Sequence, residues 1–188
     1  MASQGPLTVG TVADDATIGN IAWTSIANAR VEDGSVAQAI VSSSDVGSHY
    51  CKGTNCVFSI PSTAIIDGVL CEVKKKTGIH TAGETFSDLS VRLFIGGSYQ
   101  GDNRASGVDW PSPLTWFSYG ASFIQWGLSA AVLNPTNINA STFGFSIAGK
   151  DDVVNPPSTG RMQIDSMRIT VYYTVPATLM FPFWFMNT

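Results

Sequence analysis

The side chains best suited to chemistry include two histidines and three cysteines, and three of these five fall in one short segment, SHYCKGTNC. His49 lies two residues before Cys51, a spacing that suggests a thiol and base pair or, together with Cys56, a metal site. Zinc normally takes four ligands, however, and the third cysteine, Cys71, occupies an apolar position of the run VLCEV. We therefore expect no catalytic residue, metal ion or cofactor at this segment.

A disulfide is an open alternative for the same segment. Cys51 and Cys56 bracket the short turn Lys-Gly-Thr-Asn, which a local bridge could close once the protein leaves a reducing compartment.

The sequence carries none of the common catalytic motifs. It lacks the Gly-x-Ser-x-Gly elbow, the His-Glu-x-x-His zinc motif and a phosphate-binding glycine loop, and its only other histidine is His80. Glycoside hydrolysis would need two facing carboxylates. The acids in expected loops are not oriented toward one another by any pattern: Asp102, Asp109, Asp151 and Asp152. The sequence therefore predicts a protein that is not an enzyme, with a hydrolase as the weaker alternative.

The elements that must position these residues read as short strands. Apolar and polar residues alternate in DLSVRLFIGG and STFGFSIAGK, and Gly, Pro, Asn and Asp separate such runs. Strands with apolar side chains on one face and polar side chains on the other are typical of antiparallel sheets packed face to face. We expect an all-β, antiparallel two-sheet β-sandwich, jelly-roll-like, over residues 1–175. Its expected buried residues include Leu93, Phe145 and Val171, and its expected exposed residues include Lys74, Arg92 and Thr170.

Two strands resemble each other, IDGVLCEV from Ile66 and IDSMRITV from Ile164. The step from each isoleucine to the first inward residue is three, which predicts a bulge at Asp67 and at Asp165. The likeness is either chance or the mark of a pseudo-symmetric sandwich in which each sheet or half opens with an equivalent strand. Between strands, residues 96–113 and 151–160 are the long loops, where surface recognition is expected, and LNPTNINAST predicts a loop with one helical turn.

Composition excludes several classes of partner. Only 13% of residues are charged and the net charge is −4, so nucleic-acid binding is not expected. The cluster Lys74 to Lys76 is too small for that purpose, and Lys74 and Lys76 share a solvated strand face with Glu72. The N-terminus has no secretory pattern, and the final apolar run is too short for a bilayer and is interrupted by Pro182, so no membrane association is expected.

The chain closes on TLMFPFWFMNT, which follows the last expected strand. Exposed side chains of this size would drive association, so something must cover them. We expect residues 176–188 to form an extended arm that packs on a partner, and we leave folding back onto its own sandwich as the alternative. The expected partner interface is Phe181, Phe183, Trp184 and Phe185. Aromatic residues also gather between Trp110 and Trp126, mostly as core, with a subunit contact or sugar-stacking platform as the alternative.

Six segments together resemble a β-sandwich module of tailed-bacteriophage virion proteins and of some uncharacterised bacterial surface proteins. They are WTSIANARVEDGSVAQAIV, CVFSIPSTAIIDGVLCEVKKK, DLSVRLFIGG, WFSYGASFIQWGL, FGFSIAGK and IDSMRITVYYT, and they span residues 10–174. The module usually has Asn-Pro where this chain has Thr24, Ser25 and Ile26, and it usually lacks the cysteines.

The resemblance implies a structural protein of the virion, made in the host cytoplasm. Its expected role is that of a capsid decoration or cement protein that stabilises the head shell, as a homotrimer bound to the major capsid protein or another virion protein. A tail or fibre component that binds host-surface carbohydrate is the alternative role.

Overall fold

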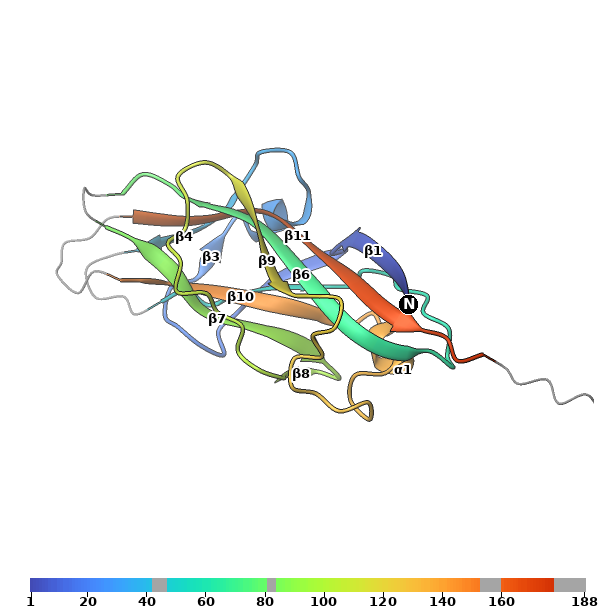
Figure 1. The fold of residues 1–188 in the computed structure, drawn as a ribbon. Helices are drawn as coiled ribbons and strands as arrows, with labels where there is room; N and C mark the ends of the chain where they lie inside the picture. Colours follow the sequence, from blue (N-terminus) through green and yellow to red (C-terminus); the bar gives the residue numbers. More distant parts are fainter. Residues whose placement is uncertain (42–46, 81–83, 153–159, 178–188) are drawn as a thin grey trace, which may run out of the picture.

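The structure is a computed structural model, which describes residues 1–41, 47–80, 84–152 and 160–177. It is an antiparallel β-sandwich, so the expected all-β fold class is confirmed. The first sheet has the order β3-β4-β11-β6-β9, with β1 also paired to β11, and the second has the order β2-β5-β10-β7-β8 (Figure 1). The strands are β1 (Ala2–Thr8), β2 (Thr11–Asp15), β3 (Trp23–Thr24), β4 (Ala37–Val41), β5 (Tyr50–Thr54), β6 (Ile65–Thr77), β7 (Phe86–Ile95), β8 (Ser98–Gln100), β9 (Thr115–Gly120), β10 (Gly144–Asp151) and β11 (Gly160–Thr174).

Most connections cross from one sheet to the other, so neighbours within a sheet are rarely consecutive in sequence. Two short helices lie in the connections: a 3-10 turn, η1 (Ile26–Arg30), and the expected single helical turn, α1 (Pro135–Ile138). Asn134 caps α1 by accepting a hydrogen bond from the Asn137 backbone N–H at 3.0 Å, and Pro135 fills the first helical position.

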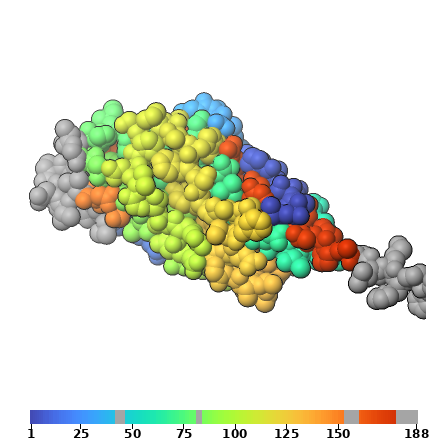
Figure 2. All heavy atoms as spheres, viewed as in Figure 1, coloured from blue at the N-terminus to red at the C-terminus, as the bar shows by residue number. Residues whose placement is uncertain are grey.

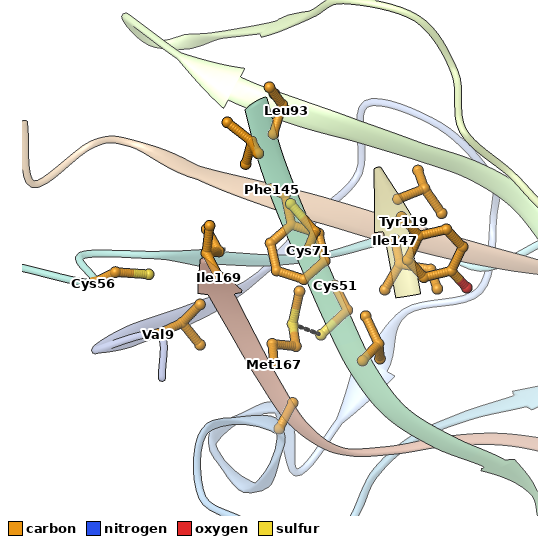
Figure 3. Close-up of a cluster of buried hydrophobic side chains, with 14 of the residues drawn as sticks. Val9, Cys51, Cys56, Cys71, Leu93, Tyr119, Phe145, Ile147, Met167 and Ile169 are labelled. Carbon is orange, nitrogen blue, oxygen red and sulfur yellow. Dashed lines mark hydrogen bonds between the residues drawn. The ribbon is translucent and has the colours of Figure 1, made fainter. Parts of the chain in front are cut away.

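The core lies between the sheets and is built by alternate residues of the central strands (Figure 3). Leu93, Phe145 and Val171 are fully buried, as expected from the alternation. Phe145 and Ile147 of β10 face Met167 and Ile169 of β11, which belongs to the opposite sheet. The period-two pattern therefore identified the inward face of these strands correctly.

The two similar strands lie side by side in the first sheet. β6 and β11 pair antiparallel with Cys71 opposite Ile169, and a register shift falls at Asp67 and another at Asp165. Both expected bulges are confirmed, and they lie symmetrically about the point where Cys71 pairs with Ile169. The expectation that each sheet opens with one such strand is wrong, because the two strands form a single local pseudo-twofold pair within one sheet.

The expected exposure of three residues is corrected. Thr170 is buried, because β1 lies against it: a Cβ on Gly5 would come within 2.8 Å of the Thr170 Cα. Arg92 is half-buried and donates to the Gly101 carbonyl at 2.7 Å. Lys74 is also half-buried, since Glu32 and Asp165 bind its ammonium group. Alternation gives the face of a strand but not what covers that face.

Replacing Asp165 with alanine is expected to cost about 3 kcal/mol of folding free energy, whereas Asp67→Ala at the equivalent bulge should cost about 1 kcal/mol. Asp165 is fully buried, accepts from the Gly34 N–H at 3.0 Å and lies 3.2 Å from the Lys74 ammonium, whereas half-buried Asp67 accepts one hydrogen bond from Thr174. Urea denaturation of both variants measures the difference. Equal losses would show that the bulge itself, and not the buried contacts, sets the cost.

Candidate functional site

The segment with His49 and the cysteines forms neither a catalytic pair nor a metal site. His49 Nδ1 lies 2.9 Å from Asp14 Oδ2 on β2, while the Cys51 thiol points into the core, 3.6 Å from the Met167 sulfur (Figure 3). Cys56 is also buried. Among the described residues, no group of three or more potential ligands could hold a metal ion.

The alternative of a Cys51 to Cys56 disulfide is not realised. All three cysteines are described, and each is a buried free thiol. Burial raises the pKa of the Cys51 thiol far above its ordinary value and that of Cys56 to about 12. Because the thiolate is the reactive form, these cysteines behave as core residues.

Two of the loop acids, Asp102 and Asp152, lie too far apart to act as a facing pair. Asp102 follows β8 and forms an ion pair with Arg104 at 3.3 Å, whereas Asp152 follows β10 and pairs with Lys150 at 2.7 Å. The Arg104 N–H binds Val91 O and the Asp152 N–H binds Thr85 O. At about 3.3 Å per residue along a strand, these anchor points lie roughly 20 Å apart, too far for the carboxylates of a glycosidase.

A buried polar cluster, which sequence reasoning missed, joins the two sheets. It consists of Lys75 on β6, Asp88 on β7, Tyr119 on β9 and Trp110 in the loop before β9. The side chains of Lys75 and Asp88 are fully buried and their charged groups bind each other directly. We call these four residues the inter-sheet cluster.

Every polar atom of the inter-sheet cluster has a partner. The Lys75 ammonium donates to Asp88 Oδ1 and contacts the Tyr119 hydroxyl at 2.7 Å. Trp110 Nε1 donates to Asp88 Oδ1 at 2.8 Å, and the Tyr119 hydroxyl donates to Asp88 Oδ2 at 2.8 Å. The Ser106 backbone N–H adds a bond to Oδ2 at 3.1 Å. The carboxylate thus receives four hydrogen bonds, an unusually complete set for a buried acid.

Aromatic rings enclose the amine of Lys75. Its nitrogen lies 4.6 Å from the ring centroid of Trp110, 4.4 Å from that of Phe117 and 5.4 Å from that of Tyr119. Burial lowers the pKa of Lys75 to about 8, although the Asp88 charge opposes the shift. Burial and the same carboxylate raise the pKa of Tyr119 well above its ordinary value, so its hydroxyl keeps its proton. The amine is therefore held dry, and its charged form is less favoured than that of an exposed lysine.

The signal for Lys75 was present in the sequence. Cys71, Val73 and Lys75 share one face of β6, so the middle lysine of the run KKK points inward while its two neighbours point outward. The partners could not be found the same way, because Asp88 lies on the other sheet and the aromatic residues come from a different strand and loop.

A second candidate site is an apolar end of the sandwich. We call Met1, Ile65, Phe123 and Val175 the apolar end face. Their exposed fractions are 65%, 53%, 73% and 48%, high values for such large apolar side chains. Ala2 pairs with Tyr173 and Ile65 with Thr174, and the loop carrying Phe123 binds β6 through Gln125 Nε2, which donates to Ile66 O at 2.8 Å. The N-terminus, the start of β6 and the end of β11 therefore meet at one end (Figure 2).

The aromatic segment from Trp110 to Trp126 divides between core and surface. Trp110, Tyr119 and Trp126 are buried, which agrees with the core interpretation, and Phe123 alone of this group is strongly exposed. Trp116 stacks on Arg168, whose guanidinium lies 3.8 Å from the ring centroid and also forms two bonds to Glu72. The described part of this segment offers one exposed ring, not the row of rings that a sugar platform uses.

A hollow of about 420 Å³ lies toward the other end of β6. Its polar lining combines the cationic side chains of Lys76 and Arg161 with neutral ones such as Gln163. Arg161 is already hydrogen-bonded to Gln38 at 3.2 Å. The hollow is open and lacks an aromatic wall, so it provides no strong site for a small molecule.

The expected partner residues Phe181, Phe183, Trp184 and Phe185 lie outside the described residues, as does most of the expected arm at 176–188. The described helices include none long and apolar enough to cross a membrane.

Comparison with known proteins finds no family model that matches this chain and no match among curated proteins.

Proposed function

We propose that this protein is a structural component of a bacteriophage virion, with capsid decoration as its role. The observation that carries the proposal is the apolar end face, which lies where β11 ends and where the aromatic C-terminal segment follows in sequence. A side chain such as Phe123 gains about 1.5–3 kcal/mol when a partner buries it. Several such residues at one end favour stable association with protein.

The interior supports the same role. The inter-sheet cluster, which holds the most reactive groups described, is enclosed between the sheets, where no substrate can reach it. The cysteines are core residues. His49 pairs with Asp14, and Asp102 and Asp152 lie far apart. A stable domain with these groups buried and one apolar end suits a part that must persist on a particle.

The proposed assembly is a homotrimer on the shell, built by the apolar end face together with Phe181, Phe183, Trp184 and Phe185. A closed ring buries the same apolar patch on each copy and leaves no open edge, and capsid shells offer threefold positions. The tail or fibre role with a carbohydrate ligand is the weaker proposal, because a stacking platform needs exposed rings, and the described aromatic segment presents mainly Phe123.

Immunogold electron microscopy tests the role. An antibody raised against the recombinant protein is expected to label the heads of particles purified from the source culture. Labelling confined to tails or fibres would favour the alternative role. Particles that carry no label, while the cell lysate reacts, would contradict a virion role altogether.

A further inference from the structure

The inter-sheet cluster has the components of an amide-forming centre. We infer that Lys75 and Asp88 condense to an intramolecular amide cross-link, which joins β6 of one sheet to β7 of the other. The inference rests on the placement of the amine, the carboxyl group and a proton relay in a dry interior, and it does not depend on the proposed virion role.

The first requirement is that the two groups meet and stay in place. Lys75 Nζ binds Asp88 directly, and neither side chain has any exposed surface. Reacting groups held in this way have effective concentrations of about 10⁵–10⁸ M, enough to drive condensations that are unfavourable between free molecules. Trp110, Ser106 and Tyr119 fix the carboxyl group, while Phe117 and other rings fix the amine.

The second requirement is a neutral pair, because an ammonium ion has no lone pair and a carboxylate resists attack. An ion pair in a poorly polarisable interior can relax by moving one proton from nitrogen to oxygen. The lowered pKa of Lys75 shows how far burial already disfavours its charged form. Tyr119 carries this proton from Nζ to Oδ2, because its hydroxyl contacts both atoms, so the amine becomes NH₂ and the acid becomes COOH on Oδ2 without exchange with solvent.

The third requirement is a path for the remaining proton, which Tyr119 provides. Its hydroxyl lies 2.7 Å from Lys75 Nζ and 2.8 Å from Asp88 Oδ2. As the Nζ lone pair forms a bond to Cγ, the hydroxyl accepts a proton from nitrogen and passes its own to Oδ2. The Cγ–Oδ2 bond then breaks and its electron pair leaves with oxygen as one molecule of water.

The fourth requirement is stabilisation of the charge that develops on the other oxygen. Trp110 Nε1 donates to Asp88 Oδ1 at 2.8 Å, and this oxygen becomes the carbonyl of the new amide. The overall change is one amine and one acid to one amide and one water, with no oxidant, reductant or cofactor. Because the ring faces of Trp110 and Phe117 exclude solvent, the amide is also protected from hydrolysis.

Intact-mass spectrometry of the denatured full-length chain tests the inference. The wild type is expected to be lighter than its sequence mass by one water molecule. After trypsin digestion, the dipeptide Lys75-Lys76 should remain attached to residues 77–92. The variant Lys75→Arg keeps the cation beside Asp88 but has no amine that this path can acylate, so it should show its full sequence mass. Tyr119→Phe should condense more slowly, seen as a mixture of the two masses in freshly made protein.

A wild-type chain at its full sequence mass would overturn the inference. The same water deficit in Lys75→Arg would also overturn it, because the loss would then arise elsewhere in the chain. These readings are made on denatured protein, so they do not require the variants to be stable.

Discussion

Replacing Asp88 with alanine is expected to lower the free energy of unfolding by about 3–5 kcal/mol, because it leaves the fully buried amine of Lys75 without its counter-charge. The amine would retain only the Tyr119 hydroxyl and the faces of the surrounding rings. Where the amide cross-link has formed, the loss of stability is larger still. The cross-link lowers the conformational entropy of the unfolded wild-type chain, and the variant cannot form it. Urea denaturation with a fixed slope measures the change.

Asp102→Ala is the matched control for that experiment. It removes the same side chain from an ion pair with Arg104, but Asp102 is 59% exposed, so its pair is expected to contribute less than about 1 kcal/mol. Lys75→Met is expected to cost less than Asp88→Ala, because Asp88 would keep its bonds from Trp110, Tyr119 and Ser106. If Asp88→Ala were no more destabilising than Asp102→Ala, the inter-sheet cluster would not hold the sheets together.

The second large effect concerns the C-terminal segment. Changing Phe181, Phe183, Trp184 and Phe185 together to serine is expected to turn an assembling chain into a monomer of unchanged fold. Each large apolar side chain buried by a partner contributes about 1.5–3 kcal/mol, and each 1.4 kcal/mol is about tenfold in affinity. Loss of four anchors therefore lowers association by several orders of magnitude. Light scattering coupled to size-exclusion chromatography reports the mass of each form.

Two further variants separate the contributions of the arm and the domain. Phe123→Ser changes only the apolar end face and should weaken assembly by roughly tenfold or more. Val57→Ser is the control, because Val57 is 76% exposed but is not one of the four residues of the apolar end face. Equal masses for the wild type and the four-residue variant would show that the segment packs on its own sandwich, and the partner hypothesis would fail.

Local patterns were sufficient to predict the central strands β6, β7, β10 and β11 and several of their inward residues. The alternation in β7 and β10 placed Leu93 and Phe145 in the core, and a step of three residues located both bulges, because pleat and bulge are properties of a single strand. The helical turn at Pro135 likewise follows from its own cap.

What could not be predicted depends on contacts between distant segments. Thr170 is covered by β1, which comes from the opposite terminus, and His49 is held by Asp14 instead of by Cys51. Lys75 could be assigned to an inward face from its own strand. Its counter-charge, Asp88 on β7, and the aromatic rings that surround its amine, such as Phe117 on β9, come together only when the two sheets pack. The candidate site missed by sequence reasoning is thus one that no single strand contains.

The most direct test of a virion role is quantitative mass spectrometry of purified particles from the source culture, with peptides of the described domain measured against those of the major shell protein. For a decoration protein, the chain is expected in the particles at a copy number comparable with that of the shell protein. A few copies per particle would instead favour the tail or fibre role. Particles free of the chain, from a culture whose lysate contains it, would contradict the account.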